Sequence, residues 1–196
     1  MTRYQSMFAD LRERRERAFI PFVMLGDPSP DASLRILHAL VAAGADALEL
    51  GIPFSDPIAD GPTIQAAAQR ALATGVTPDA CFDVLRRFRA DNDHTPIGLL
   101  VYANLVFQGG MDAFYGVASD SGVDSVLVAD VPARESMPFA GSAVDHDVDP
   151  VLIAAPNTPD HALQTIASVS RGYTYVVTRS GVTGADRAGR EDHVEL

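Results

Sequence analysis

The chain has 196 residues, of which 47% are hydrophobic, and its formal net charge is −11 at pH 7. This length and composition fit one soluble globular domain with ample core. The acidic balance excludes nucleic acid as a partner, because binding to phosphates needs a basic face. The most arginine-rich stretch, residues 12–17, is interleaved with glutamates and is typical of a solvated helix end.

The sequence also carries signals about location. No apolar run reaches the roughly 18 residues that suggest a membrane span, and the N-terminus lacks the basic, apolar and small-residue order of a signal peptide. The single cysteine, Cys81, excludes an internal disulfide and fits a reducing compartment. We therefore expect a cytoplasmic protein with no membrane partner.

Short apolar runs alternate along the chain with segments of helical periodicity. The apolar runs, each predicted to be a buried strand, are residues 19–25, 47–52, 97–102, 125–131, 150–154 and 173–178. The clearest helical segments are residues 32–43 and 78–89, in which apolar residues recur with the spacing of a helix face. Continuous apolar strands that alternate with helices indicate a parallel sheet covered on both faces.

Local signals predict where several helices begin and end. Ser29, Thr77 and Thr158 are each followed by Pro and Asp, an order in which the hydroxyl can cap a helix and the proline suits its first turn. Gly44 and Gly122 follow helical stretches, and we expect them to end those helices.

Polar residues with chemical potential follow the predicted strands. They are Asp27, Glu49 to Asp60, Asn104, Asp130, Asn157 and residues 180–184. This distribution favours a TIM (β/α)8 barrel, with its site at the C-terminal face of the strands, over an open doubly wound sheet. The first strand-to-helix turn, LGDP, lacks the GxGxxG fingerprint of dinucleotide-binding folds. About six βα units are present in this α/β chain.

The histidines show no metal-ligand spacing. They are His38, His94, His146, His161 and His193. We expect them to be surface residues, and we expect no metal site.

Residues 47–63 place an acid, Glu49, in an apolar strand and two more, Asp56 and Asp60, in the loop that follows. An ionised carboxylate buried there costs several kcal/mol, so Glu49 has either a partner or a raised pKa that lets it donate and accept protons. Two carboxylates in different surroundings suit acid–base catalysis. The alternative is that Glu49 pairs with a basic residue in the core and that both aspartates are turn and cap residues.

Two long segments carry a resemblance to a known family. LELGIPFSDPIADGPTIQ (48–65) and RSGVTG (179–184) resemble the α subunit of tryptophan synthase. The segments PFVMLGDP (21–28), YAN (102–104) and DVP (130–132) are similar to other strand-end segments of that family. The resemblance implies a lyase of tryptophan biosynthesis that cleaves indole-3-glycerol phosphate to indole and glyceraldehyde 3-phosphate by a retro-aldol reaction. It also implies that this chain uses no metal and no organic cofactor.

The resemblance further implies roles for individual residues. Glu49 would be the acid–base group at indole C3, Asp60 would accept the indole N–H and stabilise the indolenine cation, and Tyr175 would help to position substrate. The residues expected to enclose the indole ring are Phe22, Leu100, Leu127, Ala129 and Ile153.

The segment 180–184 is expected to be a mobile lid, because its two glycines permit unusual backbone angles and close approach. By resemblance, Thr183 would hydrogen-bond Asp60 when the lid closes, and the N–H of Gly184 would contribute to phosphate binding. The implied partner is a β subunit that carries pyridoxal phosphate, in an α2β2 heterotetramer, with contact expected at residues 53–60.

A complete barrel of this type needs eight βα units and about 250 residues, whereas six strands are predicted here. Residues 190–196 are predicted to begin a helix for which the sequence offers no C-terminal cap. We therefore expect residues 1–196 to be a single barrel domain that is C-terminally incomplete, with most of the phosphate cradle outside the sequence. Whether these residues alone are active is then open.

Two alternatives stay open at this point. One is another barrel enzyme that handles sugar phosphates, such as an epimerase, for which a strand-end acid and a glycine-rich lid would also serve. The other is a non-catalytic subunit that only binds the β partner.

Overall fold

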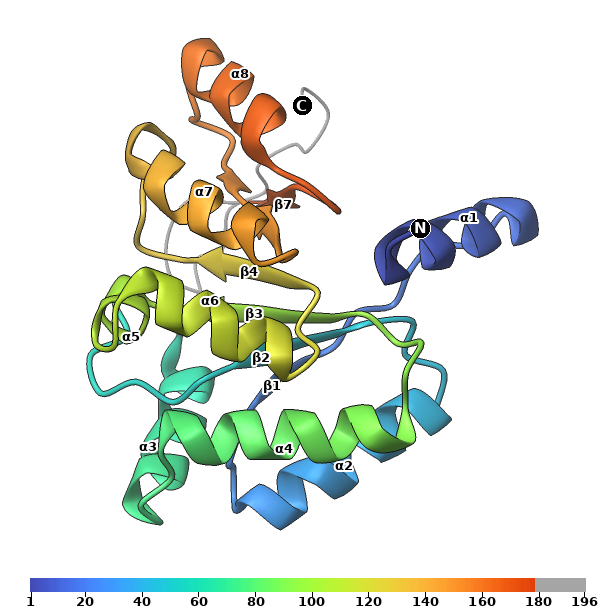
Figure 1. Cartoon of the computed structure of the whole chain (residues 1–196), viewed down its shortest axis with the longest axis vertical. Helices are drawn as coiled ribbons and strands as arrows, with labels where there is room; N and C mark the ends of the chain where they lie inside the picture. Colours follow the sequence, from blue (N-terminus) through green and yellow to red (C-terminus); the bar gives the residue numbers. More distant parts are fainter. Residues whose placement is uncertain (179–196) are drawn as a thin grey trace.

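Parallel strands form the centre of the protein in the computed structural model, which describes residues 1–178 (Figure 1). Five of them pair in chain order in one sheet: β1 (Phe22–Met24), β2 (Leu48–Gly51), β3 (Ile97–Val101), β4 (Ser125–Val128) and β5 (Asp149–Val151). Two more, β6 (Ile153–Ala154) and β7 (Tyr175–Val176), form a separate parallel pair. Parallel strands joined through helices are the arrangement of a (β/α) barrel wall.

Helices connect and cover the strands. They are α1 (Arg3–Arg14), α2 (Pro30–Ala42), α3 (Pro62–Ala73), α4 (Pro78–Asp91), α5 (Ala103–Phe107), α6 (Met111–Asp120), the short 3-10 helix η1 (Ala133–Glu135), α7 (Met137–Asp145) and α8 (Asp160–Val169). Figure 1 shows α2, α4, α6 and α7 outside the sheet, whereas α1 stands apart from them. None of the helices within residues 1–178 has both the length and the apolar character to span a membrane.

The register of the strands sorts their side chains onto two faces. Leu48, Leu50 and Leu99 belong to the main hydrophobic core, which includes Leu37 of α2 and Phe88 of α4. Side chains alternate along a strand, so the intervening residues point to the opposite, inner face. One row of paired residues on that face is Phe22, Glu49, Gly98, Ser125 and Asp149, and the next towards the strand ends is Met24, Gly51, Leu100, Leu127 and Val151.

Most of the predicted strands are confirmed, and the fifth is wrong in one respect. Residues 150–154 do not form one strand, because β5 ends at Val151 and β6 begins at Ile153. Between them the N–H of Leu152 donates to the Ser170 hydroxyl at 3.3 Å. Pairing with β4 ends at Val151, whereas the carbonyls of Leu152 and Ala154 accept the N–H groups of Tyr175 and Val177 at 3.0 Å.

Two of the three predicted helix caps are confirmed. The side chains of Ser29 and Thr77 accept hydrogen bonds from the first turns of α2 and α4. The prediction for Thr158 is wrong, because α8 has no side-chain cap and this hydroxyl accepts the N–H of Ala155 at 2.8 Å. The threonine thus closes the turn before the helix rather than the helix itself.

The two predicted terminating glycines follow α2 and α6, and both have the left-handed backbone that favours glycine. Their φ angles are +99° at Gly44 and +78° at Gly122. Gly122 also has a packing role, because a Cβ built there would lie 2.7 Å from Nε of Arg89.

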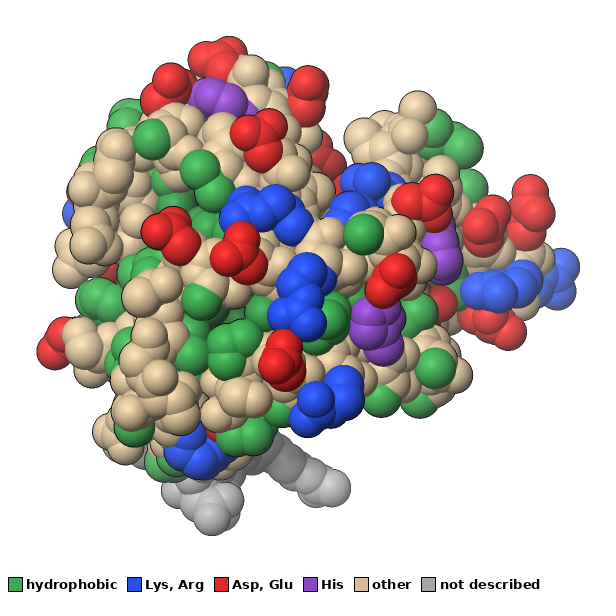
Figure 2. All heavy atoms as spheres, turned by 60° about the horizontal axis from the view of Figure 1, so that its bottom comes forward, with side chains coloured by type: hydrophobic (Ala, Val, Ile, Leu, Met, Phe, Trp, Pro, Cys, Tyr) green, Lys and Arg blue, Asp and Glu red, His purple; other side chains and the backbone are tan. Residues whose placement is uncertain are grey.

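Figure 2 shows the face reached by turning the bottom of Figure 1 forward, where acidic and basic side chains are interspersed. Several of the arginines of the outer helices form ion pairs, such as Arg87 with Asp31 at 2.9 Å. A mixed face of this kind lacks the basic stripe that nucleic-acid binding requires.

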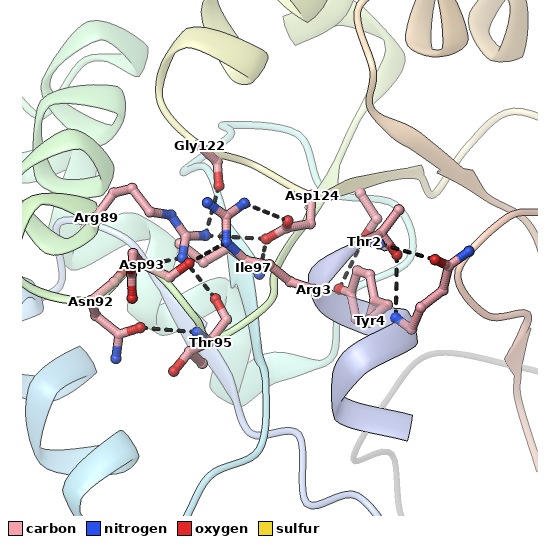
Figure 3. Close-up of polar contacts among 12 residues, drawn as sticks. Thr2, Arg3, Tyr4, Arg89, Asn92, Asp93, Thr95, Ile97, Gly122 and Asp124 are labelled. Atoms are coloured by element: carbon pink, nitrogen blue, oxygen red, sulfur yellow. Dashed lines mark hydrogen bonds and ion pairs between the residues drawn. The ribbon is translucent and has the colours of Figure 1, made fainter. Parts of the chain in front are cut away.

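A buried carboxylate joins four elements at the N-terminal ends of the strands (Figure 3). Asp124, just before β4, accepts Nη1 of Arg3 at 2.8 Å, Nη2 of Arg89 at 3.1 Å and the N–H of Ile97 at 2.8 Å. Arg89 also donates to the carbonyl of Gly122 at 2.7 Å. The carboxylate therefore ties α1, α4 and β3 to the start of β4.

We predict that Asp124→Asn lowers the free energy of unfolding by about 3 kcal/mol, because the Arg89 side chain, only 12% exposed, would lose its counter-charge. Urea unfolding monitored by circular dichroism measures the difference. Asp83→Asn is the matched control, since Asp83 is 66% exposed in its ion pair with Arg86 and its loss should cost less than about 1 kcal/mol. Equal losses in the two variants would contradict a structural role for Asp124.

Candidate active site

Glu49 is a buried acid on the inner face of β2, and the residue is only 7% exposed. Burial raises its pKa to about 7, and a hydrogen bond from Tyr173 acts in the opposite direction. The Tyr173 hydroxyl donates to Oε1 at 3.3 Å. No basic side chain within residues 1–178 contributes to this pKa, so the described part of the chain offers a neutral phenol in place of the basic partner that the sequence left open. A carboxyl group with a near-neutral pKa can both donate and accept a proton.

Hydroxyl groups from three separate segments, those of Tyr4, Ser125 and Tyr173, gather near Glu49. The hydroxyls of Tyr4 and Ser125 lie 3.0 Å apart, and the rings of Tyr4 and Tyr173 are 5.3 Å apart. Gly98 makes room for them, because a Cβ at that position would lie 2.8 Å from Ser125 Oγ and 3.0 Å from the Tyr4 hydroxyl. No local pattern marked Tyr4, Ser125 or Tyr173 as site residues; Gly98, a glycine in an apolar strand, is the one sequence signal of a close approach there.

Asp60 lies in the loop between β2 and α3 and is half-buried. Burial raises its pKa, and a hydrogen bond with Tyr102 lowers it. The loop is held at this end by Gln65, whose side-chain amide donates to the Asp60 carbonyl at 2.8 Å, and by the Tyr102 hydroxyl, which accepts the N–H of Ala59 at 3.1 Å. No pattern in the sequence pointed to this contact of Tyr102.

The other strand-end acids have structural partners. Asp56 is exposed and accepts the hydroxyl of the preceding serine, which is typical of a turn. Asp27 accepts a two-pronged hydrogen bond from Arg70, at 2.9 and 2.6 Å, and Asp130 accepts the N–H of Ala103 at 2.8 Å. The contacts of Asp27 and Asp130 connect the segment after β1 to α3 and the segment after β4 to the start of α5.

The remaining predicted site residues fall on several strands. Tyr175 of β7 pairs with Ile153 of β6, and both burial and the charge of Glu49 raise the pKa of Tyr175. The apolar residues are Phe22 on β1, Leu100 on β3, Leu127 on β4, Ala129 directly after β4, and Ile153. Phe22 pairs with Glu49, and Leu100 pairs with Leu127. Their roles stay predictions, and Thr183, Gly184 and the lid at 180–184 lie outside the described residues.

Histidines and acids form no metal-binding group of three or more within residues 1–178. His94 and His161 are exposed, and His38 is partly exposed beside Phe88. The surface expectation is wrong in part for His146, which is half-buried with Nδ1 2.8 Å from the Ser142 carbonyl. His193 is outside the described range.

A parallel (β/α) barrel wall with one buried carboxyl group of near-neutral pKa and a second carboxyl group on the adjoining loop defines a barrel enzyme of the acid–base class. Comparison with known proteins makes the assignment specific. The sequence profile described as "Tryptophan synthase alpha chain" matches residues 8–196. The chain belongs to the tryptophan synthase alpha chain family.

Relatives agree in sequence and in structure. The chain is 59% identical over 186 residues to the tryptophan synthase alpha chain of Klebsiella pneumoniae, covering 95% of this chain and 69% of that protein. The crystal structure of the alpha subunit from Legionella pneumophila superposes with a TM-score of 0.88 at 35% identity, over 91% of this chain and 68% of that one. A chain from the tryptophan synthase a2b2 complex of Pyrococcus furiosus gives a TM-score of 0.78 at 40% identity, over 81% and 65%.

We predict that Glu49→Gln changes how stability depends on pH. Because burial raises the pKa of Glu49 from its ordinary value near 4.5 to about 7, the folded protein holds this proton more tightly than the unfolded chain, so stability falls as pH rises between these values. The amide removes that loss. Between pH 5 and pH 8 the variant should gain about 2–3 kcal/mol relative to wild type in urea unfolding. Parallel stability curves would contradict the raised pKa.

Proposed function

We propose that this chain cleaves indole-3-glycerol phosphate to indole and glyceraldehyde 3-phosphate, as the α subunit of tryptophan synthase. The observation that carries the proposal is a buried Glu49 with a pKa near 7 on the inner face of a barrel that belongs to this family. The same family membership disfavours a sugar-phosphate epimerase.

The reaction is a retro-aldol cleavage that moves one proton. Indole C3 gains a proton and becomes tetrahedral, which leaves positive charge on the indole nitrogen. The glycerol hydroxyl then loses a proton, the bond between C3 and the side chain breaks, and an aldehyde forms while the indole ring regains its aromatic electrons. Glu49 delivers the first proton and takes up the second, a double role that suits a carboxyl group of near-neutral pKa.

Asp60 supplies the complementary charge. Its carboxylate accepts the indole N–H and stabilises the cation that develops at nitrogen. The hydrogen bond with Tyr102 favours the charged form of Asp60 against the effect of burial. The two acids therefore divide the chemistry, since one exchanges protons and the other holds a charge.

Other residues bind and orient the substrate in this proposal. Tyr175 lies close enough to Glu49 for its pKa to respond to that charge, which suits a group that positions the substrate beside the acid. The ring-enclosing residues are Phe22, Leu100, Leu127, Ala129 and Ile153. Thr183 is assigned to closing the lid onto Asp60, and the N–H of Gly184 to the substrate phosphate.

The partner is a β subunit in an α2β2 assembly, and residues 53–60 are the proposed contact. Ile58 in this loop is 74% exposed, as suits a residue that a partner covers. Pyridoxal phosphate belongs to the β subunit, and the α reaction uses side chains of this chain alone. We also propose that the protein is cytoplasmic. Cys81, a free and buried thiol, fits a reducing compartment.

We predict that Glu49→Gln lowers kcat for indole release at least about a hundredfold while substrate binding changes little, because the amide keeps the shape of the side chain and loses its proton. An indole-release assay with the β subunit present measures kcat and KM. Glu16→Gln, at an exposed position after α1, is the matched control and should retain wild-type activity. Activity above a few per cent in Glu49→Gln would refute the acid–base role.

We predict that Asp60→Asn lowers kcat about a hundred- to a thousandfold, because the amide removes the negative charge that stabilises the indolenine cation. Asp120→Asn, an exposed change on α6, is its matched control. An unchanged rate in Asp60→Asn would return this residue to the role of a loop and cap residue.

A further inference from the structure

Tyr102 contacts both ends of the loop that carries Asp60. The residue directly follows β3 and is only 3% exposed. Its ring stacks on Phe54, at the start of the loop, with ring centroids 5.3 Å apart and planes 27° apart. Its hydroxyl accepts the N–H of Ala59, at the far end of the loop, at 3.1 Å. One side chain from the residue after β3 thus anchors the loop that follows β2.

The tyrosine hydroxyl still has a proton to donate. A phenol has one O–H donor and can also accept hydrogen bonds, and the Ala59 N–H uses only its accepting capacity. The adjacent Asp60 carboxylate is hydrogen-bonded to the same phenol, which lowers the pKa of that carboxyl group. Burial and the charge of Asp60 raise the pKa of Tyr102 to about 12, so the phenol keeps its proton at neutral pH.

We infer that Tyr102 is a positioning residue for the α reaction: through its stacked ring and its hydroxyl it fixes residues 54–60 and aims the Asp60 carboxylate at the indole N–H. This inference rests on the proposed function. Gln65 holds the backbone of Asp60 through its carbonyl, whereas Tyr102 acts on the carboxylate itself. A charge-assisted hydrogen bond to that carboxylate is strong enough to set its orientation.

Tyr102→Phe tests the inference, because it keeps the stacked ring and removes only the hydroxyl. We expect kcat for indole release to fall about ten- to a hundredfold, since the misaimed charge acts in the transition state, while KM changes less than about threefold. The melting temperature should stay within a few degrees of wild type. Tyr115→Phe, a buried tyrosine of α6 that packs edge-on against Phe114 at 5.5 Å, is the matched control and should keep wild-type kcat.

Phe54→Leu is the second variant, and it removes the stack while it keeps the hydroxyl. It should lower kcat by a smaller factor, about three- to tenfold. If Tyr102→Phe fails to fold, this fall in kcat tests the positioning role of Tyr102, and wild-type kcat in Phe54→Leu would then overturn it. Wild-type kcat in Tyr102→Phe, an equal loss in Tyr115→Phe, or a rise in KM without loss of kcat would each overturn the inference. Absence of indole release by the wild-type protein with its β subunit would instead refute the proposed function.

Discussion

In-register parallel pairing of β1 through β5 is the constraint on which the site depends. It places Glu49 beside Phe22 on one side and Gly98 on the other, and it turns these three residues away from the helix-covered face. Alternation then buries Leu48 and Leu50 under the outer helices. A shift of one residue in β2 would reverse both faces, so the acid and the apolar core are specified by the same hydrogen bonds.

Burial of Glu49 trades stability for reactivity. A leucine at position 49 would avoid the free-energy cost of removing a carboxyl group from water. Glu49 bears that cost, and the same burial gives it a pKa near 7. The surroundings limit the cost without cancelling it. Tyr173 donates one long hydrogen bond of 3.3 Å to Glu49, and no basic side chain among the described residues lowers the pKa of this carboxyl group. The carboxyl group stays close to the point at which it can exchange a proton in either direction.

The two ends of the strands divide the work of the fold. At the N-terminal ends, Asp124 is satisfied by two arginines and a backbone N–H, which suits a group that holds elements together. Near the C-terminal ends, Asp60 has a phenol as partner, and its burial raises the pKa. A carboxylate whose hydrogen-bonding positions are all occupied by the protein is stabilised and unreactive. A carboxylate with fewer protein partners can still accept a hydrogen bond from a substrate.

Sequence by itself determined the order of strands and helices, the acid within an apolar strand and the long loop motif, because these follow from local periodicity and residue type. Only the tertiary structure revealed that the hydroxyl of Tyr173 makes the hydrogen bond to Glu49. It also revealed the contacts of Tyr102 and the break at Leu152. The physical reason is separation, since Tyr173 and Glu49 are 124 positions apart in the sequence and no local pattern records a bond across that distance.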